Sequence, residues 1–265
     1  MPANAISRLH RRCDERGNRS RMPRPKIDFF VIGAARCGTT SLYRVMQDHP
    51  GIFVPEMKEP RFFKENRNKG WAWYAAHYAD APANTLSGDL SPNYAASVGN
   101  SVAHRIHSAY PDAKIIYLVR NPIDCAISNW RMSADVSGVP VPFAEALDTW
   151  RLAVVERALF WRQLSYFREF YPDEQIKVAS LEKLRSSPEE LDSIFSFLGT
   201  DSADAVFPRA NASDWKPGRP GKPDVDHATR EHFIDLVADD AKALLSYAAL
   251  PQELWTLTPG YKGWE

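Results

Sequence analysis

Long apolar runs are missing from this chain of 265 residues, so it lacks the roughly 20 consecutive apolar residues that a membrane-spanning helix needs. Its three cysteines, Cys13, Cys37 and Cys125, are too few and too scattered for a disulfide framework or a zinc site. Lysine and arginine (33) balance aspartate and glutamate (33), so no overall charge favours nucleic acid or an anionic membrane. We therefore expect no membrane span and no nucleic-acid partner, and any anion site must be local.

Residues 1–26 differ in composition from the rest of the chain. They are poor in apolar residues, lack the hydrophobic segment of a secretory signal and carry eight basic side chains: Arg8, Arg11, Arg12, Arg16, Arg19, Arg21, Arg24 and Lys26. We expect a disordered basic arm at 1–26, followed by one domain at 27–265. The arm is read either as a leader without a role or as a contact to an anionic acceptor or surface.

The most informative stretch is residues 29–41, FFVIGAARCGTTS, in which an apolar strand leads through a turn of small residues into a helix. The backbone N–H groups of such a turn and the positive end of the helix dipole together bind phosphate. The pattern predicts a phosphate-binding loop formed by Ala35, Arg36, Cys37, Gly38, Thr39, Thr40 and Ser41.

This loop departs from that of the ATP-hydrolysing and GTP-hydrolysing enzymes. Gly33 and Gly38 have the usual spacing, but Thr39-Thr40 stands where those enzymes carry Lys-Ser/Thr. We also find no apolar strand ending in an aspartate that would anchor magnesium. A kinase or phosphotransferase using ATP therefore lacks two parts, and we expect no metal. That enzyme, an inactive nucleotide-binding scaffold and a turn that binds nothing remain the alternatives.

A second candidate anion site follows a buried strand at Ile115–Val119. Arg120 comes where this strand ends, Asn121 and Pro122 are typical of a helix start, and Ser128 follows two turns later. Ligands of parallel α/β sheets bind at the carboxyl ends of the strands. An arginine in this position is, taken alone, more often a surface cation, but together with the loop at 35–41 we expect Arg120 and Ser128 to contact the same anion.

Four segments, in order, resemble the sulfotransferases that use 3′-phosphoadenosine 5′-phosphosulfate (PAPS), a family that includes the heparan sulfate enzymes and many bacterial members. Residues 33–41 resemble the loop that binds the 5′-phosphosulfate, and Arg120 with Ser128 resembles the pair that binds the 3′-phosphate. Residues 58–63 (KEPRFF) and 91–94 (SPNY) resemble two further motifs. The resemblance runs from about residue 27 to about 200. It implies a three-layer, P-loop nucleotide-binding-like α/β fold with a mostly parallel sheet flanked by helices.

The resemblance also implies a reaction. A sulfonate group would pass from PAPS to a hydroxyl or amine of a carbohydrate, lipid or small metabolite, leaving PAP as the product. Glu59 would be the general base and Arg36 the cation beside the leaving phosphate. From the residues alone, Glu59 is equally a surface carboxylate paired with Lys58 or Arg61.

The chain departs from the family pattern at three positions of this region. Arg36 stands where most members have lysine, and Arg61 stands where many have histidine. Leu90, preceded by Asp89, stands where the glycosaminoglycan enzymes carry lysine. The acceptor side of the site is therefore expected to differ from theirs.

A basic segment rich in proline and glycine, residues 211–223, resembles in position the family's late loop over the donor. We expect Trp215 to stack on the adenine and Lys216 to contact the donor, with Arg219 and Lys222 as further candidates. The alternative is a plain surface loop.

The remaining pattern predicts scaffold. We expect a strand at 176–180 and helices at 40–49, 71–78, 100–110, 143–170 (largely helical), 188–198 and 227–245. Aromatic residues at 71–78 either shape an acceptor cleft or pack in the core. Cys37 and Cys125 are expected to fill space at the loop, with a bridge between them as the alternative.

The expected location follows from the resemblance and from the missing apolar span. Golgi sulfotransferases are usually anchored by such a span, so we expect a cytoplasmic and bacterial protein. The sequence gives no expectation for the oligomeric state.

Overall fold

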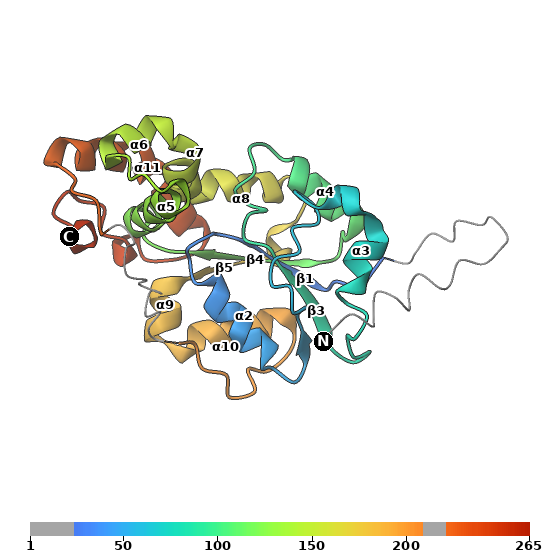
Figure 1. The fold of residues 1–265 in the computed structure, drawn as a ribbon. Helices are drawn as coiled ribbons and strands as arrows, with labels where there is room; N and C mark the ends of the chain where they lie inside the picture. The colour runs from blue at the N-terminus through green and yellow to red at the C-terminus, as the bar shows by residue number, and fades with distance from the viewer. Residues whose placement is uncertain (1–23, 209–220) are drawn as a thin grey trace.

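The computed structural model describes residues 24–208 and 221–265, in which five strands form one sheet in the order β2-β3-β1-β4-β5 (Figure 1). The strands are β1 Phe29–Gly33, β2 Ile52–Phe53, β3 Leu86–Leu90, β4 Lys114–Val119 and β5 Ile176–Ser180. Every neighbouring pair is parallel. The carboxyl ends of all five strands therefore meet at one edge, as predicted.

Helices cover both faces of this sheet (Figure 1). One face carries α2 (Thr39–Gln47), α9 (Leu181–Ser186) and α10 (Pro188–Leu198), and the other carries α3 (Gly70–Ala76), α4 (Ser101–Ala109) and α8 (Phe160–Arg168). Beyond α8 lie α5 (Pro122–Ser137), α6 (Phe143–Thr149), α7 (Arg151–Val154) and α11 (His227–Tyr247). The predicted three-layer α/β fold is confirmed.

The neighbouring strands β1 and β4 are almost entirely apolar because helices bury both of their faces. All five residues of β1 are buried, and so are the last five of β4. A second apolar cluster holds α5, α6 and α11 together through large aromatic side chains: Trp130, Phe143, Phe233 and Trp264. This second cluster supports α5, the helix that follows Arg120.

The predicted helix over 143–170 is broken into α6, α7, a 3₁₀ turn at Glu156–Ala158 and α8. Leu159 leaves the helical conformation (φ −84°, ψ 76°), and α8 then starts afresh. Asp240 of α11 accepts hydrogen bonds from the backbone N–H groups of Trp161 (2.9 Å) and Arg162 (2.8 Å). This cap comes from a segment far along the chain, so helical periodicity could not reveal it.

Helices α5 and α10 differ in how their first turns are capped. Asn121 caps α5, and its side chain accepts a hydrogen bond from Ile123 N (2.9 Å). Ser187 precedes α10, but its side chain makes no capping hydrogen bond, and its hydroxyl instead donates to Glu189.

Gly88→Ala should destabilise the fold by about 1–3 kcal/mol, the usual cost of overfilling a packed core. Gly88 pairs with Phe29 in the sheet, and an added Cβ would clash with the Phe29 ring. Urea unfolding would measure this loss. Gly221→Ala is the control, because its Cβ would meet nothing within 4 Å. Equal free energies of unfolding for the two variants would contradict the prediction.

Candidate functional site

The predicted phosphate-binding loop joins β1 to α2 at the carboxyl edge of the sheet. Gly38 is the N-cap of α2 and has a φ of 91°, a left-handed conformation that glycine adopts without strain. A Cβ at Gly38 would also lie 2.7 Å from Leu181 Cδ1. Thr39 and Ser41 are buried, whereas Thr40 is exposed. The first amides of α2 thus form a helix N-terminus of the kind that binds anions.

Arg36, Ser128 and Arg120 come together beside this loop. Arg36 Nε donates a hydrogen bond to Ser128 Oγ (2.8 Å). Arg120 Nη1 donates to the backbone carbonyl of Arg36 (3.1 Å), and its Nη2 lies 3.2 Å from Asp124 Oδ2. Strand β4 and helix α5 therefore place two guanidinium groups and a hydroxyl at the same edge as the loop.

Two buried donors at this edge have no hydrogen-bond partner among the described residues, Arg120 Nε and Arg185 Nε. Arg185 lies on α9, which follows β5. Burial and the nearby charge of Arg120 lower the pKa of Arg185. Buried donors without acceptors are costly, so this arrangement fits an added anion such as a phosphate group.

Arg185 was not among the site residues predicted from the sequence. Its position could have indicated a role, because it follows a predicted strand as Arg120 does. Arg120, however, comes directly after its strand, whereas a short helix separates Arg185 from β5.

Glu59 is connected to Thr40 through Lys58 and forms ion pairs with two cations, Lys58 and Arg61. Lys58 Nζ donates to both Thr40 Oγ1 (3.0 Å) and Glu59 Oε1 (2.9 Å). Arg61 donates to Glu59 Oε2 through Nη2 (2.6 Å) and Nε (3.1 Å), and its Nη1 donates to Glu65 (3.1 Å). Burial opposes ionisation of Glu59, but the hydrogen bonds from Lys58 and Arg61 outweigh it and lower its pKa.

The expected surface pairing of Glu59 is thus present, but it occurs beside the loop. The Glu59 side chain is only 22% exposed. Through Lys58, the carboxylate is two hydrogen bonds away from the first turn of α2. Lys58 belongs to the motif at residues 58–63, but it was not among the predicted site residues.

Two arginines of the site have unusual backbone conformations. Arg36 has a φ of 69° and Arg61 a φ of 50°, in a region that residues other than glycine seldom adopt. Such conformations persist only where the surroundings impose them, and they cluster at functional sites. Arg36 contacts Ser128, and Arg61 contacts Glu59.

A buried carboxylate, Asp89, is connected by hydrogen bonds to the segment that carries Glu59. Asp89, in β3, accepts hydrogen bonds from Tyr74 (2.8 Å), Tyr94 (3.0 Å) and Ser91 (2.6 Å). The Ser91 hydroxyl in turn accepts one from Arg61 N (3.0 Å). Desolvation raises the pKa of Asp89 to about 6, although these hydrogen bonds oppose the shift.

The position of Asp89 near the end of a strand resembles that of a magnesium anchor, which sequence analysis did not find. Its side chain is fully buried, and both oxygens already accept hydrogen bonds from hydroxyl groups. The neighbouring tyrosines include Tyr74 of α3, whose ring stacks on Phe62 at 4.4 Å. Asp89 therefore ties α3 and the 91–94 segment to the loop that carries Glu59.

Asp89→Asn should change the pH dependence of stability. The pKa of Asp89 in the folded protein, about 6, lies above the ordinary aspartate value of 3.8, so the folded state holds the proton more tightly. The contribution of Asp89 is therefore present below about pH 4 and is lost as the pH rises through 6, a change of about 3 kcal/mol. Urea unfolding from pH 4 to 7 should show the wild type losing stability relative to the variant, whereas parallel curves would count against this assignment. Burial also raises the pKa of Asp240 to about 6, but this group is the same in the wild type and the variant, so its effect cancels in the comparison.

The other predicted features have mixed outcomes. Trp215, Lys216 and Arg219 lie outside the described residues. Cys37 and Cys125 are buried and free, with each Sγ 3.7 Å from the carbonyl of Ala35, so they pack beneath the loop. Within residues 24–208 and 221–265, no group of three or more His, Cys, Asp or Glu side chains could hold a metal. Nor does any helix in that part of the chain have the length and apolar character to cross a bilayer.

Curated proteins of similar sequence are named as sulfotransferases. Human heparan sulfate glucosamine 3-O-sulfotransferase 6 is 28% identical over 180 residues, covering 64% of this chain and 51% of the relative. The membrane-associated sulfotransferase kil1 of Dictyostelium discoideum is 33% identical over 110 residues, covering 40% of this chain and 23% of the relative. The chain thus spans about half the length, or less, of these curated relatives.

Solved structures show the same fold. A sulfotransferase from Alicyclobacillus acidocaldarius superposes with a TM-score of 0.70 at 24% identity, covering 86% of this chain and 97% of that one. Mouse sulfotransferase SULT7A1, solved in complex with PAP, gives a TM-score of 0.54 at 17% identity, covering 82% and 85%. The family model of the sulfotransferase domain matches residues 26–215. The chain therefore belongs to the sulfotransferase domain family.

Proposed function

We propose that this protein transfers a sulfonate group from PAPS to a hydroxyl or amine of an acceptor. The observation that carries the proposal is the bridge made by Lys58, which hydrogen-bonds Thr40 at the start of α2 and the carboxylate of Glu59. A group that can take a proton thereby lies next to an anion-binding helix N-terminus. Sulfonate transfer to a hydroxyl needs both within reach of one substrate pair.

The donor would be held at two places. The amides and hydroxyls of residues 35–41 would bind the 5′-phosphosulfate, and Arg120 with Ser128 would bind the 3′-phosphate. The buried Nε atoms of Arg120 and Arg185 supply donors for that second group. Trp215 and Lys216, outside the described residues, remain predicted contacts to the adenine and the donor.

The chemistry assigns different roles to Glu59 and Arg36. The acceptor oxygen or nitrogen attacks sulfur and loses its proton to Glu59, which Lys58 and Arg61 keep ionised. The bond between sulfur and the bridging phosphate oxygen breaks, and PAP leaves with the additional negative charge. Arg36, together with the loop amides, would stabilise that charge.

The acceptor is proposed as a carbohydrate, a lipid or a small metabolite. The human relative's name specifies a glucosamine of heparan sulfate, but Arg61 and Leu90 differ from what is usual in the glycosaminoglycan enzymes. Residues 27–265 are proposed to form the single catalytic domain. A cytoplasmic location and a bacterial origin remain predictions from the sequence, and cell fractionation tests the first.

A transfer assay tests this function. The purified protein is incubated with ³⁵S-labelled PAPS and separate pools of glycosaminoglycans, hydroxylated lipids, phenols and amines, and the label is followed into each pool. Transfer that depends on the protein into at least one pool is expected. A parallel assay uses ATP labelled with ³²P on its γ-phosphate, with Mg²⁺ and the same pools. Transfer of labelled phosphate, with no transfer of sulfonate into any pool, would support the phosphotransferase alternative.

A further inference from the structure

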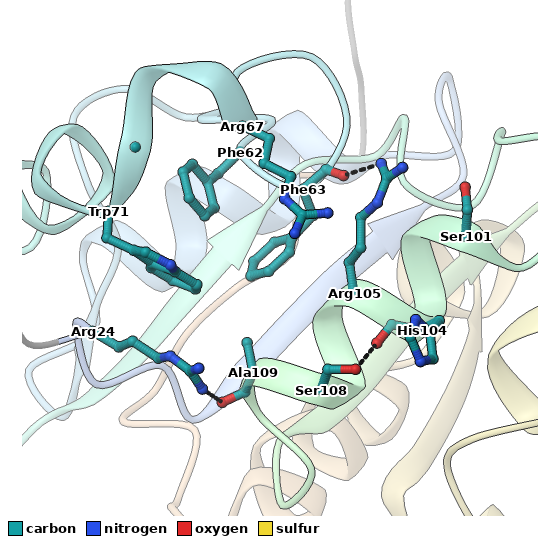
Figure 2. A pocket seen from close by; sticks show the side chains of 11 residues that line it. Arg24, Phe62, Phe63, Arg67, Trp71, Ser101, His104, Arg105, Ser108 and Ala109 are labelled. Carbon is teal, nitrogen blue, oxygen red and sulfur yellow. Dashed lines mark hydrogen bonds between the residues drawn. The ribbon is translucent and has the colours of Figure 1, made fainter. Parts of the chain in front are cut away.

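A second basic site lies apart from the donor loop, between α3 and α4 (Figure 2). There a cavity of about 570 Å³ is lined by residues that include Arg24, Arg67 and Arg105. His104 also lines it, and no acidic side chain is among the lining residues. In Figure 1, α3 and α4 lie at one end of the sheet, whereas α5 and α9, which carry Ser128 and Arg185, lie at the other.

The three guanidinium groups have no carboxylate partner among the described residues. Arg24 donates to the carbonyl of Ala109 (3.3 Å) and Arg105 to that of Phe63 (3.1 Å), while the Arg67 side chain has no hydrogen-bond or ion-pair partner within residues 24–208 and 221–265. Elsewhere in the described chain, arginines are commonly paired with acids, as are Arg61, Arg120, Arg151, Arg162 and Arg168. Three uncompensated positive charges around one cavity repel one another, and a bound anion would relieve that repulsion.

The wall of the cavity is aromatic. Phe62 and Phe63 are 2% exposed, and the ring of Trp71 faces the cavity beside them (Figure 2). The Arg24 guanidinium lies 5.2 Å from the centre of the Trp71 ring, which restrains both groups. A flat ring beside Trp71 and the Arg24 guanidinium would contact this aromatic wall while its charged substituents reach the arginines.

We propose that this cavity binds a small organic polyanion, a ring that carries two or more sulfate, sulfonate, phosphate or carboxylate groups. Its arginines and its aromatic wall would recognise the charges and the ring respectively. Phe62 and Phe63 directly follow the segment of Glu59 and Arg61, so the proposed ligand would lie against the other end of the same loop. The proposal does not depend on the identity of the donor.

Calorimetry with two probes tests the site and the kind of ring. Naphthalene-1,5-disulfonate supplies an aromatic ring and sucrose octasulfate a sugar ring. Arg67→Ala should weaken binding of the preferred probe at least tenfold, because it removes one of the three positive charges around the cavity. The fold should be unaffected, since this side chain has no partner in the described structure. Trp71→Phe should remove most of the change in tryptophan fluorescence that accompanies binding.

Two control variants separate this site from other anion binding. Arg44→Ala removes an arginine of α2 that does not line the cavity, and Arg120→Ala removes the proposed donor contact; both should keep wild-type affinity for the probe. Binding that is lost in Arg120→Ala but kept in Arg67→Ala would place the probe in the donor site and overturn the proposal. The absence of binding by either probe would also overturn it.

Discussion

Replacing Glu59 by glutamine is expected to lower kcat by about 10²–10⁴-fold, the usual contribution of a general base. Glutamine keeps the size of the side chain and can still accept a hydrogen bond from Lys58, but it cannot take a proton from the acceptor. Affinity for PAP should stay within about twofold, since the donor contacts lie on the loop and on Arg120. Steady-state kinetics and calorimetry on the same preparations separate the two effects.

The matched control is Glu56→Gln, which neutralises an exposed glutamate three residues earlier. It should leave kcat unchanged. The pH profile gives an independent check: because Lys58 and Arg61 lower the pKa of Glu59, its carboxylate persists in acid, and kcat/KM should fall only below the ordinary range of a glutamate. A Glu59→Gln enzyme with wild-type kcat would remove Glu59 from the mechanism.

Arg120→Ala is expected to weaken PAP binding by roughly 10- to 150-fold, the equivalent of losing one charged hydrogen-bonding partner. The side chain of Arg120 is only 18% exposed, and its Nε has no partner among the described residues. Water therefore competes poorly with a phosphate group for this Nε donor. Because the variant also leaves Asp124 without this ion pair, thermal unfolding should be measured alongside binding.

Arg120→Lys and Arg44→Ala make this result specific. Lysine keeps the charge but not the planar fork of donors, so Arg120→Lys should bind PAP with intermediate affinity. Arg44→Ala, an exposed arginine of α2, should bind like the wild type. If Arg120→Ala is folded and binds PAP as tightly as the wild type, the 3′-phosphate lies elsewhere.

The sequence predicts structure well where the pattern lies within one continuous segment. The loop at 33–41 and the Arg120–Ser128 pair each occupy one continuous segment, and the parallel sheet brings the two segments together, as the hydrophobic patterns indicated. The strand at 176–180 and the cap at Asn121 were recognised for the same reason.

Contacts between segments that are distant in the chain could not be predicted from the sequence. The hydrogen bond from Lys58 to Thr40, the cap that Asp240 provides for α8 and the hydroxyl cluster around Asp89 each join residues whose proximity only the folded chain reveals. Asp89 was noted as the neighbour of Leu90, but a single aspartate in a short strand gives no sign that it is buried. The break in the predicted 143–170 helix has the same origin, since tertiary packing overrides helical periodicity.

Titration of the unmodified protein with PAP, in EDTA, tests the central claim most directly. Parallel titrations use ATP with Mg²⁺ and adenosine 5′-phosphosulfate, which lacks the 3′-phosphate. The account predicts that PAP binds without metal and at least tenfold more tightly than either of the others. Tight binding of ATP that requires Mg²⁺, with no binding of PAP, would contradict it.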